Sequence, residues 1–381
     1  MQNLIGRKIK ILYYFKMQDS FMYKWQQVHI FDELLQNNIE VTVFNPLKIT
    51  PVECISKLKD LIRANEFDIF MTCHGDAIIK EEIVPVFNKL GIPTLLICFD
   101  NLHAPYLHKQ IAKYFDLVWL TSRETMPLFK RWGCKNVTFQ PYAANPYLFK
   151  PKTIQRVALN EVSFIGTPYG TRVNKINKLT YNNIPVSVYS DSINKNALSK
   201  SEVLESWASS SNLLEKVSTL ASYKEGRKVL LSAFINRFLG KEDNLLENDS
   251  LKVCPSVSFD EMVNIYTNSS LSLNILELRN TYVLSKPVYK LHLRTFEVPM
   301  AGGLQFTSYF PELSEYFEEE KEIVMYKSEE EYLDKARFYI DSKNNNLVKS
   351  MKERARFRAV NEHTWTNRFD KIFENLGLSR K

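Results

Sequence analysis

Hydrophobic residues in the first 150 positions form short, continuous runs, separated by stretches in which apolar residues recur every three to four positions. The runs predict buried strands of a parallel sheet, and the intervening stretches predict helices that cross between them. The expected strands cover residues 8–15, 40–44, 67–73, 93–99, 116–121 and 137–140, and the expected helices cover 23–36, 51–64, 79–90, 104–114 and 122–132. The pattern predicts a doubly wound α/β domain whose ligands bind at the carboxyl ends of the strands.

A second alternating series follows the segment 141–151, which contains three prolines and is expected to be a linker. Its expected strands cover 162–165, 186–189, 271–275, 304–307 and 323–326, and its helices lie near 172–182, 259–267, 293–301, 311–317, 329–341 and 345–360. A helical, Ser- and Lys-rich insertion at about 195–250 interrupts the series, and a last helix is expected over 366–377. The chain is therefore divided into domains 1–150 and 151–362 and a C-terminal segment, 363–381.

The composition fits a globular protein with sizeable cores, since 45% of the 381 residues are apolar and 24% are charged. The longest apolar runs, such as 93–99, have the length of a strand and are too short to span a membrane. The start of the chain enters a strand pattern without a small-residue cleavage site, so no signal peptide is expected. Five scattered cysteines without a CxxC pair are expected to be reduced thiols of a cytoplasmic protein, and no structural zinc site is predicted.

The net charge of +7 is modest for this length and suits a phosphate-bearing ligand or an anionic membrane surface. Nucleic acid is not an expected partner, because no RNA- or DNA-binding signature accompanies the basic residues. The insertion interleaves apolar residues with Lys224, Arg227, Lys228, Arg237 and Lys241. A basic amphipathic helix of this kind lies on a membrane or, more commonly, covers a sheet or a neighbouring helix.

Familiar phosphate-binding motifs are missing, since the chain has no Walker A sequence, no GxGxxG and no Asp-x-Asp pair to grip a metal–diphosphate complex. A diphosphate would then be held by helix N-termini and basic side chains, without a metal ion. The turn after strand 162–165 is one candidate, because Gly166 and Gly170 permit tight backbone turns and Arg172 can reach a phosphate. The alternative is that these glycines serve only the turn between strand and helix.

The second candidate is the stretch 290–303, in which a loop enters a helix that carries Glu297 in its first turn and ends at a Gly-Gly pair. A carboxylate in this place can accept hydrogen bonds from both ribose hydroxyls of a nucleotide whose diphosphate lies on the helix N-terminus. The alternative is that Arg294 and Glu297 form a surface pair that stabilises the helix by about 0.2–0.5 kcal/mol. The residues alone leave both interpretations open.

Most of residues 141–370 resembles the group 1 glycosyltransferases in the order and spacing of motifs, and the CgeB-like (spore maturation) branch is the most similar. The resemblance rests on Phe164-Ile-Gly166 with Arg172, Val257-Ser-Phe-Asp260, Leu273-Asn-Ile275, Leu293-Arg-Thr-Phe-Glu-Val-Pro-Met-Ala-Gly-Gly303 with Pro311-Glu-Leu313, Lys321-Glu-Ile-Val-Met-Tyr326, and His363-Thr-Trp365 with Arg368. The N-terminal domain matches this family only in its alternation of strands and helices.

The resemblance implies a GT-B fold, in which two Rossmann-like domains face a cleft and the last helix crosses back to the first domain. The first domain would bind the acceptor and the second the nucleotide sugar. Arg172 matches a basic residue of the diphosphate clamp, and the loop 290–293, with Lys290, His292 and Leu293, matches the loop whose amides hold the diphosphate. Gly166 and Arg294 complete this predicted donor site.

Glu297 matches the second glutamate of the family's E-x7-E motif, which binds the ribose, and Ser258 and Phe259 fall where relatives position the nucleobase. The first glutamate of the motif would fall at position 289, which is Tyr289. That glutamate contacts the sugar in many retaining members. Because it is replaced by tyrosine here, the donor sugar and the stereochemical outcome stay open.

A catalytic base, in an inverting reaction, is expected from the first domain. The ends of its predicted strands carry Cys73-His-Gly-Asp76 and Phe99-Asp-Asn-Leu-His103. Asp100 and His74 are the candidates for removing the proton of the acceptor hydroxyl. The alternative for each is a polar loop residue or a helix N-cap.

These features predict a hexosyltransferase that uses no metal or other cofactor and moves a sugar from a nucleoside diphosphate sugar to a saccharide or lipid-linked acceptor. The family analogy places the reaction in bacterial surface polysaccharide or glycoprotein biosynthesis, in the cytoplasm or in peripheral contact with the inner membrane. Two other functions stay open. One is a GT-B-fold nucleotide-sugar epimerase, which consumes the donor without an acceptor, and the other is a non-catalytic GT-B-like binding protein.

Overall fold

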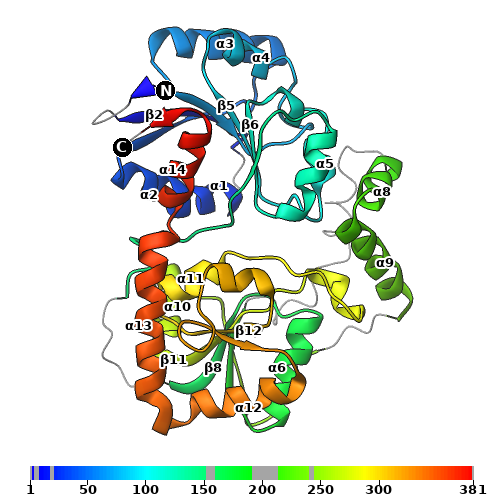
Figure 1. Ribbon diagram of the computed structural model, residues 1–381, viewed down its shortest axis with the longest axis vertical. Coiled ribbons are helices and arrows are strands. Elements are labelled where there is room, and N and C mark those ends of the chain that lie inside the picture. The colour runs from blue at the N-terminus through cyan, green and yellow to red at the C-terminus, as the bar shows by residue number, and fades with distance from the viewer. Residues whose placement is uncertain are drawn as a thin grey trace. The chain divides into compact units, whose positions relative to one another are not determined.

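The computed structural model describes residues 2–3, 8–17, 21–151, 159–190, 213–239 and 244–379. These residues form two α/β units, each built around a parallel sheet (Figure 1). By their contacts, the first unit comprises the described residues within 1–142, 210–230 and 365–381, and the second comprises those within 143–209 and 231–364. The predicted α/β class with two doubly wound sheets is confirmed.

The first sheet has six parallel strands among the described residues, in the order β3-β2-β4-β5-β6-β7. Its strands are β2 (Ile9–Tyr14), β3 (Ile39–Phe44), β4 (Ile69–Thr72), β5 (Thr94–Cys98), β6 (Leu117–Leu120) and β7 (Val137–Phe139). Every residue of β4, β5 and β6 is buried, because helices cover both faces of the sheet. These helices include α1 (Phe21–Gln26), α2 (Asp32–Gln36), α3 (Pro51–Ala64), α4 (Val84–Lys89) and α5 (Met126–Arg131).

Proline shortens two of the predicted helices of this unit. Pro85 and Pro127 fall inside the predicted helices 79–90 and 122–132, where a proline removes a hydrogen bond and clashes with the preceding turn. Helices α4 and α5 each begin one residue before their proline, so that the proline lies in the first turn, where no N–H is needed. Both predicted helices therefore began too early.

The second sheet has six parallel strands in the described chain, in the order β10-β9-β8-β11-β12-β13. They are β8 (Leu159–Ile165), β9 (Val186–Tyr189), β10 (Leu251–Cys254), β11 (Ser269–Leu273), β12 (Gln305–Ser308) and β13 (Val324–Tyr326). Its helices include α6 (Thr171–Tyr181), α10 (Phe259–Asn268), α11 (Arg294–Met300), α12 (Glu329–Ile340) and α13 (Asn345–Glu362). The predicted helix 311–317 is a 3-10 turn, Pro311–Glu315.

Part of the predicted insertion packs with the first unit. Helix α8 (Leu213–Ala221) and the start of α9 (Lys224–Leu239) belong there by their contacts. The Tyr223 hydroxyl donates to the carbonyl oxygen of Leu102 at 2.6 Å, and Lys109 Nζ lies 3.0 Å from Glu215 Oε1. The insertion 195–250 is predicted to lie in the second domain, whereas the long-range contacts place residues 213–230 in the first unit.

The C-terminal end of the chain also belongs to the first unit. Glu33 is fully buried, and its carboxylate accepts hydrogen bonds from the backbone N–H groups of Trp365 at 3.2 Å and Thr366 at 2.7 Å. A negative charge at the N-terminus of α14 (Trp365–Asn375) is stabilising, because it satisfies unpaired N–H groups and opposes the helix dipole. Beyond α14, β14 (Leu378–Ser379) pairs in parallel with β1 (Gln2–Asn3).

Candidate functional site

Two segments of the predicted donor site meet in the second unit. Gly166 follows β8, at the sheet edge where open parallel sheets bind ligands, and Arg294 is the first residue of α11. A Cβ atom at Gly166 would overlap the guanidinium of Arg294, and the backbone φ of +133° is one that L side chains rarely adopt. The glycine therefore lets the guanidinium lie directly against the backbone of the turn.

Arg172 lies at the same turn. Its Nη1 donates to the carbonyl oxygen of Thr167 at 3.0 Å, and its guanidinium is 4.4 Å from the centre of the Tyr169 ring. The ring of Phe164 lies close to both arginines, 5.9 Å from the guanidinium of Arg172 and 6.0 Å from that of Arg294. Two guanidinium groups thus gather at one glycine turn, and such groups match the oxygens of a diphosphate in charge and geometry.

Glu297 lies in the first turn of α11 with only 6% of its surface exposed. Burial raises the pKa of its carboxyl to about 7, and the positive charge of Arg294 opposes part of that rise. The alternative of an exposed ion pair on a helix surface is therefore wrong for this glutamate. Its carboxyl instead changes charge near neutral pH, on the same helical turn as Arg294.

The predicted diphosphate loop runs directly into α11. The backbone N–H of Lys290 donates to the carbonyl oxygen of Leu276 at 2.9 Å, and the Lys290 side chain is buried. His292 and Leu293 are half-buried, and the N–H of His292 donates to Thr295 Oγ1 at 3.3 Å. Backbone pairing at one end and the helix at the other therefore fix this loop.

Ser258 and Phe259 have clear structural roles at the start of α10. The Ser258 side chain accepts from the N–H of Glu261 at 3.3 Å, while the Glu261 carboxylate accepts from the N–H of Ser258 at 2.8 Å, which makes a capping box. The ring of Phe259 packs edge-on against Phe149, with 6.5 Å between ring centres. These contacts give both residues structural roles, and their contact with a nucleobase stays a prediction.

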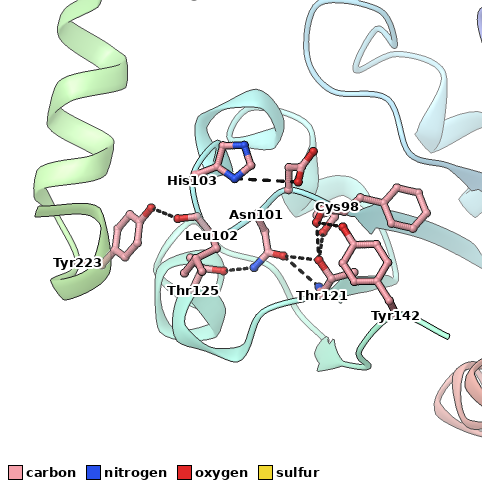
Figure 2. A network of polar contacts seen from close by, with 10 residues as sticks. Cys98, Asn101, Leu102, His103, Thr121, Thr125, Tyr142 and Tyr223 are labelled. Carbon is pink, nitrogen blue, oxygen red and sulfur yellow. Dashed lines mark hydrogen bonds and ion pairs between the residues drawn. The ribbon is translucent and has the colours of Figure 1, made fainter. Parts of the chain in front are cut away.

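In the first unit, a buried polar network holds the turn that follows β5 (Figure 2). The Asn101 amide donates to the carbonyl oxygen of Ser122 at 2.7 Å and to Thr125 Oγ1 at 2.5 Å, and its Oδ1 accepts from the N–H of Thr121 at 3.0 Å. The neighbouring Asp100 has 51% of its side chain exposed, and its Oδ1 lies 4.0 Å from His103 Nδ1. The network thus fixes the backbone beside an exposed carboxylate.

Two tyrosines hold the same turn from outside it (Figure 2). The Tyr142 hydroxyl donates to the carbonyl oxygen of Phe99 at 2.7 Å. The Tyr223 hydroxyl donates to the carbonyl oxygen of Leu102, three residues further along the same turn. In place of the predicted helix 104–114, the chain forms two 3-10 turns, Pro105–His108 and Ala112–Tyr114. The alternative of Asp100 as the N-cap of a long helix is therefore wrong.

His74 has a different environment from Asp100. Its Nε2 accepts a hydrogen bond from the backbone N–H of Lys16 at 2.9 Å, and its ring packs on Phe15 with 4.6 Å between ring centres. Burial is the main cause that lowers its pKa to about 4, so the imidazole is neutral at pH 7. Because Nε2 accepts the hydrogen bond from Lys16, its lone pair is not free to take a proton from another group in this conformation.

Two aromatic residues at the glycine turn, Tyr169 and Tyr282, are not among the predicted site residues. A Cβ atom at Gly170 would lie 2.7 Å from the ring of Tyr282, and Tyr169 stacks on the Arg172 guanidinium. Gly170 is predicted to permit a tight turn, but nothing in the sequence indicated that Tyr282 lies against it.

Among the described residues, no group of three or more His, Cys, Asp or Glu side chains is arranged to hold a metal ion. In that part of the chain, no helix is both long and apolar enough to cross a membrane.

Residues 209–374 match the protein-family model described as glycosyl transferase-like. No curated protein sequence matches the chain at a significant level. Among solved structures, HepE from Anabaena in complex with UDP-glucose gives a TM-score of 0.54 at 11% identity, over 97% of this chain and 99% of that chain. An alpha-glucosyltransferase in complex with UDP and a 13-mer DNA containing an HMU base gives 0.56 at 14% identity, over 97% and 100%. Sucrose-phosphate synthase from Thermosynechococcus elongatus gives 0.52 at 11% identity, over 97% and 99%.

These comparisons establish the fold class. Both parallel sheets and their covering helices match glycosyltransferases over nearly the whole chain, so the chain has the GT-B fold. At identities of 11–14%, the likeness to those structures carries the fold and not their activity.

Proposed function

We propose that the protein transfers a sugar from a nucleoside diphosphate sugar to a saccharide or lipid-linked acceptor, in bacterial surface polysaccharide or glycoprotein biosynthesis. The observation that carries this proposal is the pair of guanidinium groups, from Arg172 and Arg294, gathered at the Gly166 turn on the carboxyl edge of the sheet. The glycosyl transferase-like match over residues 209–374 covers α11 and supports the same reaction class. HepE in complex with UDP-glucose and the alpha-glucosyltransferase in complex with UDP are similar in fold, so uridine nucleotides are the first donors to test.

In the proposed reaction, the bond between the anomeric carbon and the β-phosphate oxygen breaks while the acceptor hydroxyl attacks the anomeric carbon. Negative charge develops on the departing diphosphate. Arg172 and Arg294 would stabilise that charge, together with Lys290 and the backbone of the loop 290–293. This role for positively charged side chains is the reason to expect a reaction that needs no metal ion.

Free nucleotide sugars provide the direct test of this function. UDP-, GDP-, ADP- and dTDP-sugars and a CMP-sugar are screened for stabilisation of the protein against thermal unfolding, since a ligand at 100 times its Kd stabilises by about 2.7 kcal/mol. Binding of one donor, followed by its turnover only when an acceptor is present, is the expected result. Turnover to an epimer without an acceptor would identify an epimerase instead, and binding without any turnover would identify a non-catalytic protein.

Glu297→Gln is expected to weaken binding of the donor by about 10- to 100-fold at pH 8, because the variant loses a charge-assisted hydrogen bond to the ribose. The wild-type affinity should also rise between pH 6 and pH 8. Since the pKa of Glu297 is about 7, its carboxyl is mostly neutral at pH 6 and ionised at pH 8, and only the ionised form accepts a charge-assisted hydrogen bond through each of its two oxygens. Calorimetric titration at both pH values measures the two effects.

The matched control is Glu353→Gln, which neutralises an exposed glutamate of α13. This control should bind the donor as tightly as the wild type at both pH values. If Glu297→Gln keeps the wild-type affinity and its pH dependence, Glu297 has no part in donor binding.

We further propose a cytoplasmic location with peripheral contact to the inner membrane through α9. Lys224, Arg227, Leu231, Phe234 and Phe238 follow one another at spacings of three and four, so they share one face of the helix, and all five are exposed. Aromatic and aliphatic side chains beside basic ones suit an anionic lipid surface. The five cysteines, all free thiols, favour a reducing compartment. Lys241, the last of the five basic residues named in the predicted insertion, lies outside the described residues.

Replacing Lys224, Arg227 and Arg237 by glutamine tests this surface. Each basic residue near an anionic membrane contributes about 1 kcal/mol, so the triple variant should bind anionic vesicles about 100-fold more weakly in a co-sedimentation assay. The control replaces three basic residues of α3, Lys57, Lys59 and Arg63, by glutamine and should bind as the wild type does. Equal sedimentation of all three proteins would leave α9 with a packing role only.

A further inference from the structure

A short backbone ladder after β11 places a glutamate beside the predicted donor loop. Leu278 N–H donates to the carbonyl oxygen of Val288 at 2.7 Å, and the N–H of Lys290 donates to that of Leu276. Between these bonds, Glu277 lies directly opposite Tyr289 in an antiparallel bridge. Directly opposed residues of such a bridge project their side chains to the same side. Glu277 therefore shares a face with Tyr289, one residue before Lys290.

Among the described residues, only one of the two oxygens of the Glu277 carboxylate has a hydrogen-bond partner. Its Oε1 accepts a hydrogen bond from Ser308 Oγ at 3.1 Å, and Ser308 Oγ is also 3.1 Å from the Tyr326 hydroxyl. Its Oε2 is buried and has no hydrogen-bond partner among the described residues. Leaving a carboxylate oxygen without a partner is unfavourable. A ligand hydroxyl that donates to it would remove that cost.

Hydroxyl and aromatic side chains lie near this carboxylate, at the same edge of the sheet as Gly166. Ser308 and Tyr326 end β12 and β13, and Glu277 follows β11, which pairs in parallel with β8. The Lys175 ammonium lies 4.8 Å from the Tyr326 ring centre, which places a positive charge in the same region. Tyr289 stacks on Phe310, with 5.5 Å between ring centres. Carboxylate, hydroxyl and aromatic groups therefore line one region.

We propose that Glu277 binds hydroxyl groups of the transferred sugar, and so selects donors whose sugar is a hydroxyl-bearing hexose over deoxy sugars. This inference rests on the proposed function. The position that the resemblance reserved for a glutamate is Tyr289, and the bridge places the Glu277 side chain directly beside it. The carboxylate for the sugar thus comes from the opposite strand of the ladder and not from residue 289.

The test compares the nucleotide with the nucleotide sugar. Wild-type protein and Glu277→Gln are titrated with UDP-glucose and with UDP, or with the donor and diphosphate pair that the wild type binds most tightly in the screen. The variant should bind UDP-glucose about 10- to 100-fold more weakly and UDP equally well, since only the sugar contacts the carboxylate. A UDP-glucose analogue lacking the contacted hydroxyl should bind both proteins alike.

Other outcomes overturn the inference and separate it from the proposed function. Unchanged affinity for UDP-glucose, or an equal loss for UDP and UDP-glucose, assigns Glu277 a structural role while the donor site stands. Failure of the wild type to bind any nucleotide or nucleotide sugar rejects both proposals. Ser308→Ala, which removes the partner of Oε1, should give a smaller loss in the same direction, and Glu353→Gln should give none. A Ser308→Ala loss that extends equally to UDP also counts against the subsite.

Discussion

Asp100→Asn is expected to lower the rate of sugar transfer by about 10²–10⁴-fold, the range of general-base catalysis, while leaving affinity for the donor unchanged. Asp100 follows β5, at the edge where parallel sheets bind ligands, and half of its side chain is exposed. Because it does not cap a helix, the change to asparagine removes the charge without removing a structural contact of that kind. Initial rates with saturating donor, together with the donor Kd, measure both parts.

The stereochemistry of the product gives an independent check on this role. A base that deprotonates the acceptor belongs to a single displacement, so the anomeric configuration should be inverted in the product, as seen by NMR. Asp60→Asn, at an exposed position of α3 where the carboxylate lies 3.4 Å from Arg63 of the same helix, serves as the control and should keep full activity. Near-normal turnover by Asp100→Asn, or retained configuration, would indicate that the departing phosphate takes the proton.

The sheets were largely predictable because buried parallel strands leave a strong signal. Strands β4 and β5 are apolar and buried at nearly every position, and their predicted ranges contain the observed ones. Strand β10 was missed, because two of its four residues are exposed and, among the strands that the structure describes, it pairs with β9 alone. Its residues carry no continuous apolar run, and only pairing with β9 makes them a strand.

The candidate site was predictable only in pieces. Gly166 and Arg294 were each identified from local motifs, yet the close contact between them depends on how β8 and α11 pack, which no local pattern encodes. The sequence left Glu297 open between a ligand contact and a surface pair, and burial decided against the latter. Glu277 was overlooked because its significance comes from the bridge to Tyr289, twelve positions further along the chain.

Arg294→Gln is expected to reduce kcat by about 10²–10³-fold, the scale for removing one preorganised group that stabilises developing negative charge. The larger share of the effect should fall on kcat, because the charge on the diphosphate grows as the bond to the sugar breaks. Arg337→Gln, which removes an exposed arginine of α12, should leave turnover unchanged. Wild-type turnover should also be unaffected by EDTA. A strict requirement for magnesium or manganese would contradict leaving-group stabilisation by the arginines alone.

Gly166→Ala should resemble Arg294→Gln in turnover, because its Cβ occupies the space of the guanidinium. The alanine also adds backbone strain of about 1–3 kcal/mol at a φ of +133°, which an unfolding titration measures separately. If the glycine acts by admitting Arg294, the double variant should be no slower than Arg294→Gln, since the second change then removes nothing further. If the two losses multiply in the double variant, Gly166 and Arg294 act independently, and admitting the guanidinium is not the role of the glycine.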